Sequence, residues 1–341
     1  MSMSLVVLLP LILLGIVGTL CFVGCAFNTQ GLETPFTTYT GTTILLNPAI
    51  MAYWPLGDLA DTVPAAELIS GNTGNYIDPA TAPSLYPWPA YSLPNAPGPD
   101  VLSDAAPGTI LFLQPGIVAG DAVQPANDPA AVTPCVVVNG CYVEVPFNVK
   151  FVPPTSFTVE AWVRVDWTAG DPSAFRFVLD MREFSPVTAG FGICAKADDT
   201  QAGVYQWRGI IGDGSNAFTF ADSNEALVTL KDPAATAPPK SQYVALTYDG
   251  TSQALILYVN GEQQAKVDNV GYAANTTQPL WIGAGAPYVP RRPQAAGVTA
   301  SPLFPFVGAI QDVAIYSAAL APDVILQHFN NGNGTDPQPG N

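Results

Sequence analysis

The stretch Phe157-Thr-Val-Glu-Ala-Trp-Val-Arg-Val165 decides the fold of this chain. Side chains alternate between the two sides of an extended strand, so every second residue shares a face. One of these faces is wholly apolar and consists of Phe157, Val159, Ala161, Val163 and Val165. This period of two predicts a strand whose apolar face lies in a core. On the opposite face, we expect Glu160 to face solvent or to pair with Arg164.

Similar strand patterns continue on both sides of this stretch. The predicted strands fall at residues 141–146, 176–181, 190–195, 205–211, 217–220, 243–249, 254–259, 280–283 and 307–316. Many short strands at close spacing are typical of a two-sheet antiparallel sandwich. Near the end of the chain, Pro322 begins a short helix and Gly332 closes it, which is the usual asymmetry of helix ends.

The composition excludes one class of partner. The 341 residues carry a net charge of −16, and no Lys or Arg occurs before Lys150. A nucleic-acid-binding protein needs a basic face to neutralise phosphates, so we expect no nucleic acid partner. The acidity serves solubility, or it serves the binding of cations or of a basic partner.

The cysteines occur in separate settings. Cys135 and Cys141 lie close together on either side of the turn dipeptide Asn139-Gly140. The segment could double back there and close a disulfide in an oxidising compartment. Two buried thiols are the equally weighted alternative. No pair of CxxC motifs is present, so a zinc site is not expected.

The chain starts with an apolar run over residues 5–27 that contains no charged side chain. At about 1.5 Å per residue, a helix of this length crosses the hydrocarbon core of a bilayer. We therefore predict a transmembrane anchor helix over residues 1–27. One narrow face of small side chains would let another membrane helix pack closely, and it comprises Gly15, Gly18, Cys21 and Cys25.

Two other fates of this run stay open. A cleaved signal peptide normally has a basic start, which residues 1–4 lack. The segment Phe22-Val-Gly-Cys25 resembles a lipoprotein cleavage box, which would make Cys25 a lipidated N-terminus. We favour the retained helix. The predicted location is a bacterial inner membrane, crossed once, with the C-terminal domain in the periplasm.

The rest of the chain divides into a linker, one large domain and a loose tail, predicted at residues 28–46, 47–335 and 336–341. Residues 77–134 are rich in Pro, Ala, Asp and Asn. This composition favours long loops over regular strands. We predict that these residues form an insertion on one edge of the sandwich, with short strands near 109–113 and 117–119.

Several motifs, in order along the chain, resemble those of the laminin-G-like, concanavalin A-like jelly-roll family. They are Met51-Ala-Tyr-Trp-Pro-Leu-Gly-Asp58, Ser156-Phe-Thr-Val-Glu-Ala-Trp-Val163, Tyr243-Val-Ala-Leu-Thr-Tyr-Asp-Gly250, Trp281-Ile-Gly-Ala284 and Phe306-Val-Gly-Ala-Ile-Gln-Asp-Val-Ala-Ile-Tyr316. The resemblance implies an all-β jelly roll of two antiparallel sheets packed face to face. It does not imply a single function, because this fold includes lectins, glycosidases and scaffold domains.

The sequence lacks the residue sets of a hydrolase. Glycosidases of this fold carry Glu-x-Asp-x-x-Glu on one strand, which supplies the two carboxylates that the reaction needs, and no such run occurs here. His328 is the one histidine, and no nucleophile-elbow motif accompanies it. We therefore predict that the protein is not an enzyme and that His328 is a packing or surface residue.

Two ligand sites follow from the resemblance. Related folds often hold calcium in a rim loop, where carboxylate and carbonyl oxygens are available. The candidate calcium ligands are Asp213 and Asn216 in one turn, and Asp58 and Asp312 in segments that are neighbours in the family. The alternative for each is an ordinary turn residue that caps its own backbone.

Aromatic side chains could form a platform for a sugar ring. Trp54, Trp162 and Trp281 match core positions of the family. Trp167 and Trp207 are freer to lie on the surface, so they are the candidates for stacking.

Two function classes stay in view. The first is a structural, accessory subunit of a bacterial membrane complex, photosynthetic or respiratory, which would contact other membrane subunits through the N-terminal helix and the jelly-roll surface. The second is a membrane-tethered, lectin-like module that binds glycan, with or without calcium. The anchor and the absence of catalytic sets favour the first.

Overall fold

A computed structural model describes residues 39, 43–57, 64–77, 109–114, 117–118, 135–169, 175–184, 187–224, 227–232, 234, 239–285 and 304–333, and for 109–114 it describes the backbone only. The predicted membrane helix with Gly15, Gly18, Cys21 and Cys25 lies outside these residues, as do Asp58 and the tail. Within the described ranges, no helix has the length and apolar character needed to cross a bilayer.

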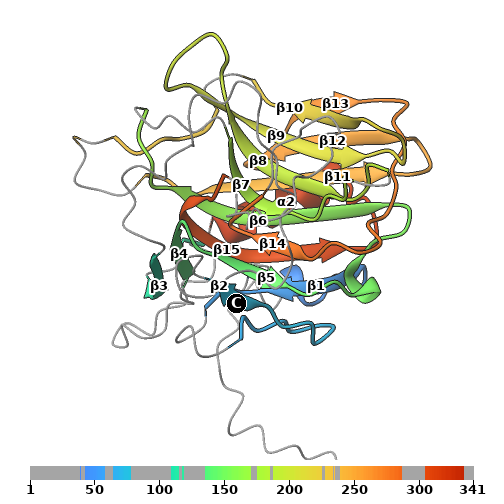
Figure 1. Ribbon diagram of the computed structural model, residues 1–341, viewed down its shortest axis with the longest axis horizontal. Helices are drawn as coiled ribbons and strands as arrows, with labels where there is room; N and C mark the ends of the chain where they lie inside the picture. The colour runs from blue at the N-terminus through green and yellow to red at the C-terminus, as the bar shows by residue number, and fades with distance from the viewer. Residues whose placement is uncertain are drawn as a thin grey trace, which may run out of the picture. The chain divides into compact units, whose positions relative to one another are not determined.

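The domain is a sandwich of two antiparallel sheets (Figure 1). The eight-stranded sheet has the order β13-β12-β11-β6-β15-β4-β3, and β1 also pairs with β15. Its strands are β1 (Ile50–Trp54), β3 (Thr109–Gln114), β4 (Cys135–Asn139), β6 (Phe157–Val165), β11 (Gln242–Asp249), β12 (Ala254–Val259), β13 (Glu262–Val267) and β15 (Val307–Tyr316).

The seven-stranded sheet has the order β10-β9-β8-β7-β14-β5-β2. Its strands are β2 (Asn75–Ile77), β5 (Tyr142–Val145), β7 (Phe175–Asp180), β8 (Phe191–Ala197), β9 (Tyr205–Gly212), β10 (Phe218–Asp222) and β14 (Leu280–Ile282). A short 3-10 turn, η4 (Val149–Phe151), follows β5, and the helix α2 (Pro322–Gly332) ends the domain.

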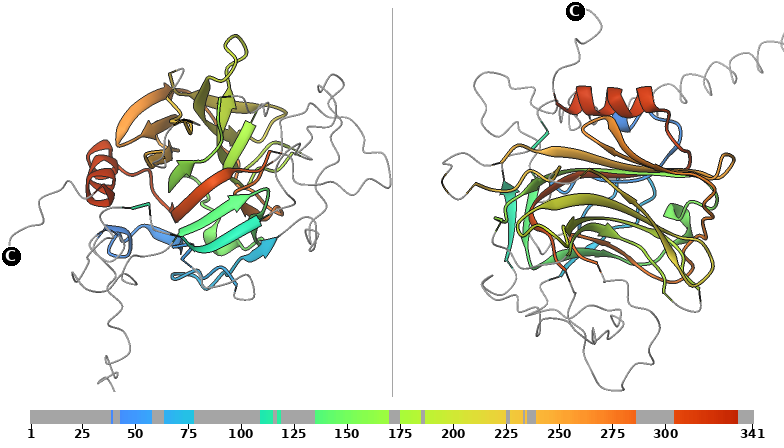
Figure 2. Two further views of the ribbon diagram at one scale, coloured as in Figure 1. Left: turned by 90° about the vertical axis from the view of Figure 1, so that its left-hand side faces the viewer. Right: turned by 90° about the horizontal axis from the view of Figure 1, so that it is seen from above.

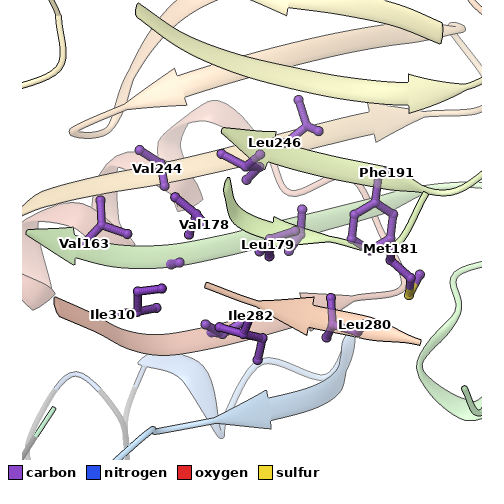
Figure 3. Packing of buried hydrophobic residues seen from close by; sticks show 14 of the residues in the cluster. Val163, Val178, Leu179, Met181, Phe191, Val244, Leu246, Leu280, Ile282 and Ile310 are labelled. Carbon is purple, nitrogen blue, oxygen red and sulfur yellow. The ribbon is translucent and has the colours of Figure 1, made fainter. Parts of the chain in front are cut away.

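The core lies between the two sheets (Figure 3). Val163 on β6 and Ile310 on β15 face Leu179 on β7 and Ile282 on β14 across this layer. Each fully buried aliphatic side chain of this kind stabilises the fold by about 1.5–3 kcal/mol relative to exposure. The apolar face of β6 that the alternation predicted is therefore confirmed as the core face.

The other face of β6 is buried as well, which the sequence pattern did not predict. Helix α2 lies against the outer face of the eight-stranded sheet (Figure 2). Glu160 is fully buried there, so the expectation that it faces solvent is wrong. Arg164 pairs with Asp166 instead, with its Nη2 2.9 Å from the carboxylate. A period of two shows only that the two faces of a strand differ, and here a helix covers the second one.

Part of the predicted linker belongs to the packed domain. Tyr39, Thr43 and Ile44 are buried, and the two apolar ones join the cluster between α2 and the sheet. The linker prediction for residues 28–46 is therefore wrong at these positions. The residues next to them in the sequence are mostly polar or small. The sequence pattern therefore did not predict that this segment packs onto the sandwich.

The two neighbouring cysteines are buried thiols and are not joined in a disulfide. Cys135 begins β4 in one sheet, whereas Cys141 directly precedes β5 in the other. The turn at Asn139-Gly140, with φ +81° at the glycine, carries the chain from one sheet to the other. The predicted doubling back does not occur, and the buried-thiol alternative describes the structure.

Candidate functional site

The outer face of the seven-stranded sheet carries the polar and aromatic side chains that could bind a ligand. One row of aligned residues crosses the whole sheet from β2 to β10, and it consists of Asn75, Glu144, Trp281, Asp180, Gly192, Ile210 and Phe220. Aligned partners on neighbouring strands lie on the same face. Their sequence neighbours Ile193 and Ile211 point into the core, so this row faces outward.

Two shorter rows lie beside the first one on strands β7 to β10. The second row consists of Phe177, Cys194, Arg208 and Asp222. The third consists of Phe175, Lys196 and Gln206. This end of the sheet therefore combines phenyl rings with both signs of charge.

A closed part of this face is built around Arg182. Its Nε and Nη2 donate to the two carboxylate oxygens of Asp180 at 2.7 and 2.9 Å. The guanidinium carbon lies 4.7, 5.1 and 5.3 Å from the ring centres of Phe177, Phe184 and Phe218. Both charged side chains are almost wholly buried. A buried charge needs such a partner and such rings to offset its lost hydration.

Gly192 makes room for this ion pair. A Cβ at that position would lie 3.2 Å from Oδ1 of Asp180 and 3.5 Å from Nε of Arg182. The pair therefore lies across the one position in the row that has no side chain. Because both side chains are almost wholly buried, this pair is a structural part of the face and is closed to a ligand.

The open part of the face lies over β8, β9 and β10. We call Lys196, Gln206, Arg208, Phe220 and Asp222 the β8–β10 strip. Arg208 donates from Nε and Nη2 to the two carboxylate oxygens of Asp222, each at 2.5 Å. Its guanidinium carbon lies 4.4 Å from the ring centre of Phe220. The side chains of Arg208 and Asp222 are 14% and 31% exposed, so both remain accessible.

The remaining strip residues complete a polar surface. Gln206 is the aligned neighbour of Lys196 and is half-buried. Lys196 places its Nζ 2.7 Å from the carboxylate of Asp199. The strip thus presents the planar Arg208–Asp222 pair, fixed by its own hydrogen bonds, beside the half-buried phenyl ring of Phe220. Such prearranged groups suit a ligand with paired hydroxyls and an apolar ring face, since little side-chain entropy is lost on binding.

Two carboxylates on the long row were not singled out from the sequence. Glu144 and Asp180 flank Trp281, two strand spacings apart, which corresponds to roughly 9–10 Å. Glu144 accepts from the indole Nε1 of Trp281 at 3.0 Å. Both carboxylates are fully buried, and the described contacts give each of them a structural partner.

The predicted stacking residues lie elsewhere. Trp167 and Trp207 are buried in the core between the sheets, so the prediction that they lie on the surface is wrong. The alternation in Tyr205-Gln-Trp-Arg208 carries the signal that could have corrected it. Since Tyr205 and Trp207 share the inner face, Gln206 and Arg208 must share the outer one.

The first pair of predicted calcium ligands, Asp213 and Asn216, lies at one turn. Asp213 accepts from the backbone and the hydroxyl of Ser215 at 2.8 and 2.6 Å. Partial desolvation raises the pKa of Asp213, but these hydrogen bonds more than offset it and leave the pKa below its usual value. Asn216 is exposed beside this turn. The geometry is that of a residue capping its own turn, which was the alternative reading.

Asp312 belongs to the eight-stranded sheet, whereas Asp213 follows β9 of the seven-stranded sheet. It is fully buried in β15 and accepts from the Tyr53 hydroxyl at 2.5 Å. Across the described ranges, no group of three His, Cys, Asp or Glu side chains could hold a metal ion. Asp58, its proposed partner, lies outside those ranges.

The strand order defines a two-sheet jelly-roll sandwich, with polar and aromatic groups on the outer face of its seven-stranded sheet. The sequence model of the Concanavalin A-like lectin/glucanases superfamily matches residues 139–326. This match covers more than half of the chain, and the protein therefore belongs to that superfamily. No curated protein sequence matches the chain.

Solved structures give weaker similarities. The binding domain of botulinum neurotoxin serotype C1 is 15% identical, with a TM-score of 0.36, and the match covers 56% of this chain and 40% of that one. The SAP-like pentraxin from Limulus polyphemus is 12% identical, with a TM-score of 0.34, over 51% and 70% of the two chains. The CBM40 of the Ruminococcus gnavus IT-sialidase is 15% identical, with a TM-score of 0.36, over 52% and 84%.

Coverage of the neurotoxin binding domains is partial. The match spans about two fifths of the neurotoxin chains, at 39% for the structures of the DC and type C domains. Similarity at this level says nothing about the ligand of this chain.

Proposed function

We propose that this protein is a non-catalytic, lectin-like binding module that recognises glycan through the β8–β10 strip. The observation that carries the proposal is the Arg208–Asp222 pair held over Phe220 on a partly open sheet face. Membership of a superfamily that contains lectins supports it.

The chemistry of the strip matches the chemistry of a sugar. A pyranose presents neighbouring hydroxyls, each of which donates and accepts, and one flat apolar face of C–H groups. Arg208 offers donors and Asp222 offers acceptors, while Gln206 offers both. The phenyl ring of Phe220 provides an apolar surface for the C–H face.

The proposal does not require a metal. Within the described residues, no acidic cluster is present that would hold calcium, and the polar groups of the strip can contact hydroxyls directly. We therefore expect binding to persist when a chelator is added. Loss of binding in the chelator arm would show that a calcium site takes part in recognition.

The cellular setting remains part of the proposal. The apolar run over residues 5–27 supports a membrane-tethered module, and the periplasmic side of a bacterial membrane is the setting that we propose for its domain. The accessory-subunit role has no support in the family match or in the contacts described above. We therefore place glycan binding first.

A glycan array with the full chain in mild detergent tests this function. We expect a defined set of glycans to bind the wild type. Arg208→Ala and Phe220→Ala should each weaken binding about tenfold or more, because hydrogen bonds to charged groups and ring contacts contribute on that scale.

The matched control is Lys266→Ala. It removes a cation from an ion pair with Asp268 on β13, with a Nζ–Oδ1 distance of 2.8 Å, and β13 belongs to the other sheet. Binding should be unchanged in this variant. Equal binding by the wild type, Arg208→Ala and Phe220→Ala would overturn the assignment of the strip.

A further inference from the structure

The opposite side of the sandwich carries a polar cluster that glycan binding does not use. Glu160 lies at the middle of the outer face of the eight-stranded sheet and is fully buried. Three hydroxyls and one imidazole surround its carboxylate. They come from parts of the chain that are far apart in sequence.

Each neighbour of Glu160 belongs to a different segment. Tyr243 on β11 and Tyr316 on β15 donate to the carboxylate at 2.5 and 2.8 Å. Nδ1 of His328 on α2 lies 2.9 Å from one carboxylate oxygen. The hydroxyl of Tyr39 lies 3.4 Å from the other. One carboxylate therefore holds the N-terminal and the C-terminal parts of the domain at the same point.

The prediction that His328 is a packing or surface residue is only partly right. It is buried, with 2% of its surface exposed, yet it also contacts the buried carboxylate. Its position on α2 therefore has an electrostatic partner as well as a packing role.

The same two segments also meet directly. Asn331 on α2 donates from Nδ2 to the hydroxyl of Thr43 at 2.7 Å. Trp162 on β6 lies between them, with Phe329 of α2 stacked at 5.9 Å and Tyr39 edge-on at 6.1 Å between ring centres. The indole of Trp162 thus contacts both ends of the domain.

Glycines allow the helix to lie close to the sheet. A Cβ on Gly332 would overlap the indole of Trp162, and a Cβ on Gly261 would come within 2.9 Å of Leu326. Gly261 also has φ +79°, which other residues rarely adopt. The close approach of α2 therefore depends on glycines in the helix and in the turn between β12 and β13.

We propose that α2 and the segment made of Tyr39 and residues 43–46 form a terminal clasp, which fastens the N-terminal part of the chain to the outer face of the eight-stranded sheet. The partner of this surface is the chain's own N-terminal segment. Since the core separates the two outer faces, the clasp holds Tyr39 and residues 43–46 on the side opposite the β8–β10 strip.

The clasp and the proposed glycan site are independent of each other. Failure of every glycan to bind leaves the clasp untouched, and failure of the clasp leaves the strip untouched. The competing account is that α2 and the N-terminal segment each pack on the sheet separately. The two accounts differ in whether disturbing α2 releases residues 39–46.

Hydrogen exchange followed by mass spectrometry on the full chain, in mild detergent, separates them. Asn331→Ala removes a half-buried hydrogen-bond donor on α2 without touching the sheet. We expect peptides covering residues 39–46 to exchange about fivefold faster, the scale of one net hydrogen bond. Peptides from β8 to β10 should not change.

A second variant removes a different contact of α2, and a control changes an exposed residue of the same helix. His328→Phe keeps an aromatic ring but removes the contact to Glu160, and it should speed exchange in both α2 and residues 39–46. Gln327→Ala changes an exposed residue of α2 and should change neither. Faster exchange in α2 with residues 39–46 unchanged, in both Asn331→Ala and His328→Phe, would overturn the clasp.

Discussion

The side chain of Glu160 carries a buried carboxylate, and the groups that contact this carboxylate determine whether it is stable there. A carboxylate without partners would be costly at this depth, and the surrounding donors offset that cost. Desolvation raises the pKa of Glu160, but the neighbouring His328 and the hydrogen bonds from Tyr243 and Tyr316 more than offset it. The pKa of Glu160 therefore lies below the usual value of 4.5.

This shift predicts how stability depends on pH. A carboxyl group whose pKa is lower in the folded state stabilises the fold above its unfolded pKa, and that contribution is lost as the pH falls through the folded pKa. We expect the free energy of unfolding, measured by urea titration from pH 7 to pH 3, to fall more steeply in the wild type than in Glu160→Gln.

The comparison cancels the other carboxyl groups whose pKa values are lowered. Glu67, Asp213 and Asp249 also have lowered pKa values, and they are present in both proteins. Parallel pH profiles for the wild type and Glu160→Gln would contradict the account of Glu160.

At the scale of elements, the strands could be predicted because each carries an alternating apolar face. From residue 141 onward, the ends of the predicted strands agree with the observed ends within two residues. The edge strand β13 was missed because Glu262–Val267 has only two apolar residues, Ala265 and Val267, which are too few to show an alternating pattern. The predicted short strand near 109–113 is present as β3, whereas the described residues 117–118 are not in a strand.

The site was harder to predict than the fold. Arg208 and Asp222 are 14 residues apart and pair only because β9 and β10 align them. Local periodicity places each of them on an outer face, but it does not show which strands are neighbours. Glu160 contacts His328 on a helix that lies more than 160 residues later in the chain. The alternation of residues along β6 cannot predict that this helix covers its outer face.

Helix α2 supports a prediction in which two effects oppose each other. Gly332→Ala should favour the helix by about 1 kcal/mol from propensity alone. The added Cβ would overlap the rigid indole of Trp162, and overpacking of this kind costs about 1–3 kcal/mol. We expect net destabilisation, measured as a lower urea midpoint with an unchanged slope.

Gln327→Ala is the control on the exposed side of the same helix. It should change the free energy of unfolding by less than about 0.5 kcal/mol. A Gly332→Ala protein that is more stable than the wild type would show that α2 does not lie close against Trp162.

At the scale of the whole molecule, the sandwich has two outer faces with different chemistry. One is covered by the clasp and buries the carboxylate of Glu160. The other carries the partly open β8–β10 strip.

The tether itself has a direct test in the intact mass of the purified protein. A retained membrane helix predicts a mass that includes the whole apolar run over residues 5–27. A mass that begins at Cys25 and includes acyl groups would show a lipid anchor in place of the predicted helix.

The central claim is that the β8–β10 strip binds glycan, and one measurement tests it most directly. Hydrogen exchange of the full chain is compared with and without the strongest glycan from the array. We predict slower exchange in peptides from β8, β9 and β10, with α2 and residues 39–46 unchanged, and no such protection in Arg208→Ala. Protection at any other face, or equal protection in Arg208→Ala, would contradict the claim.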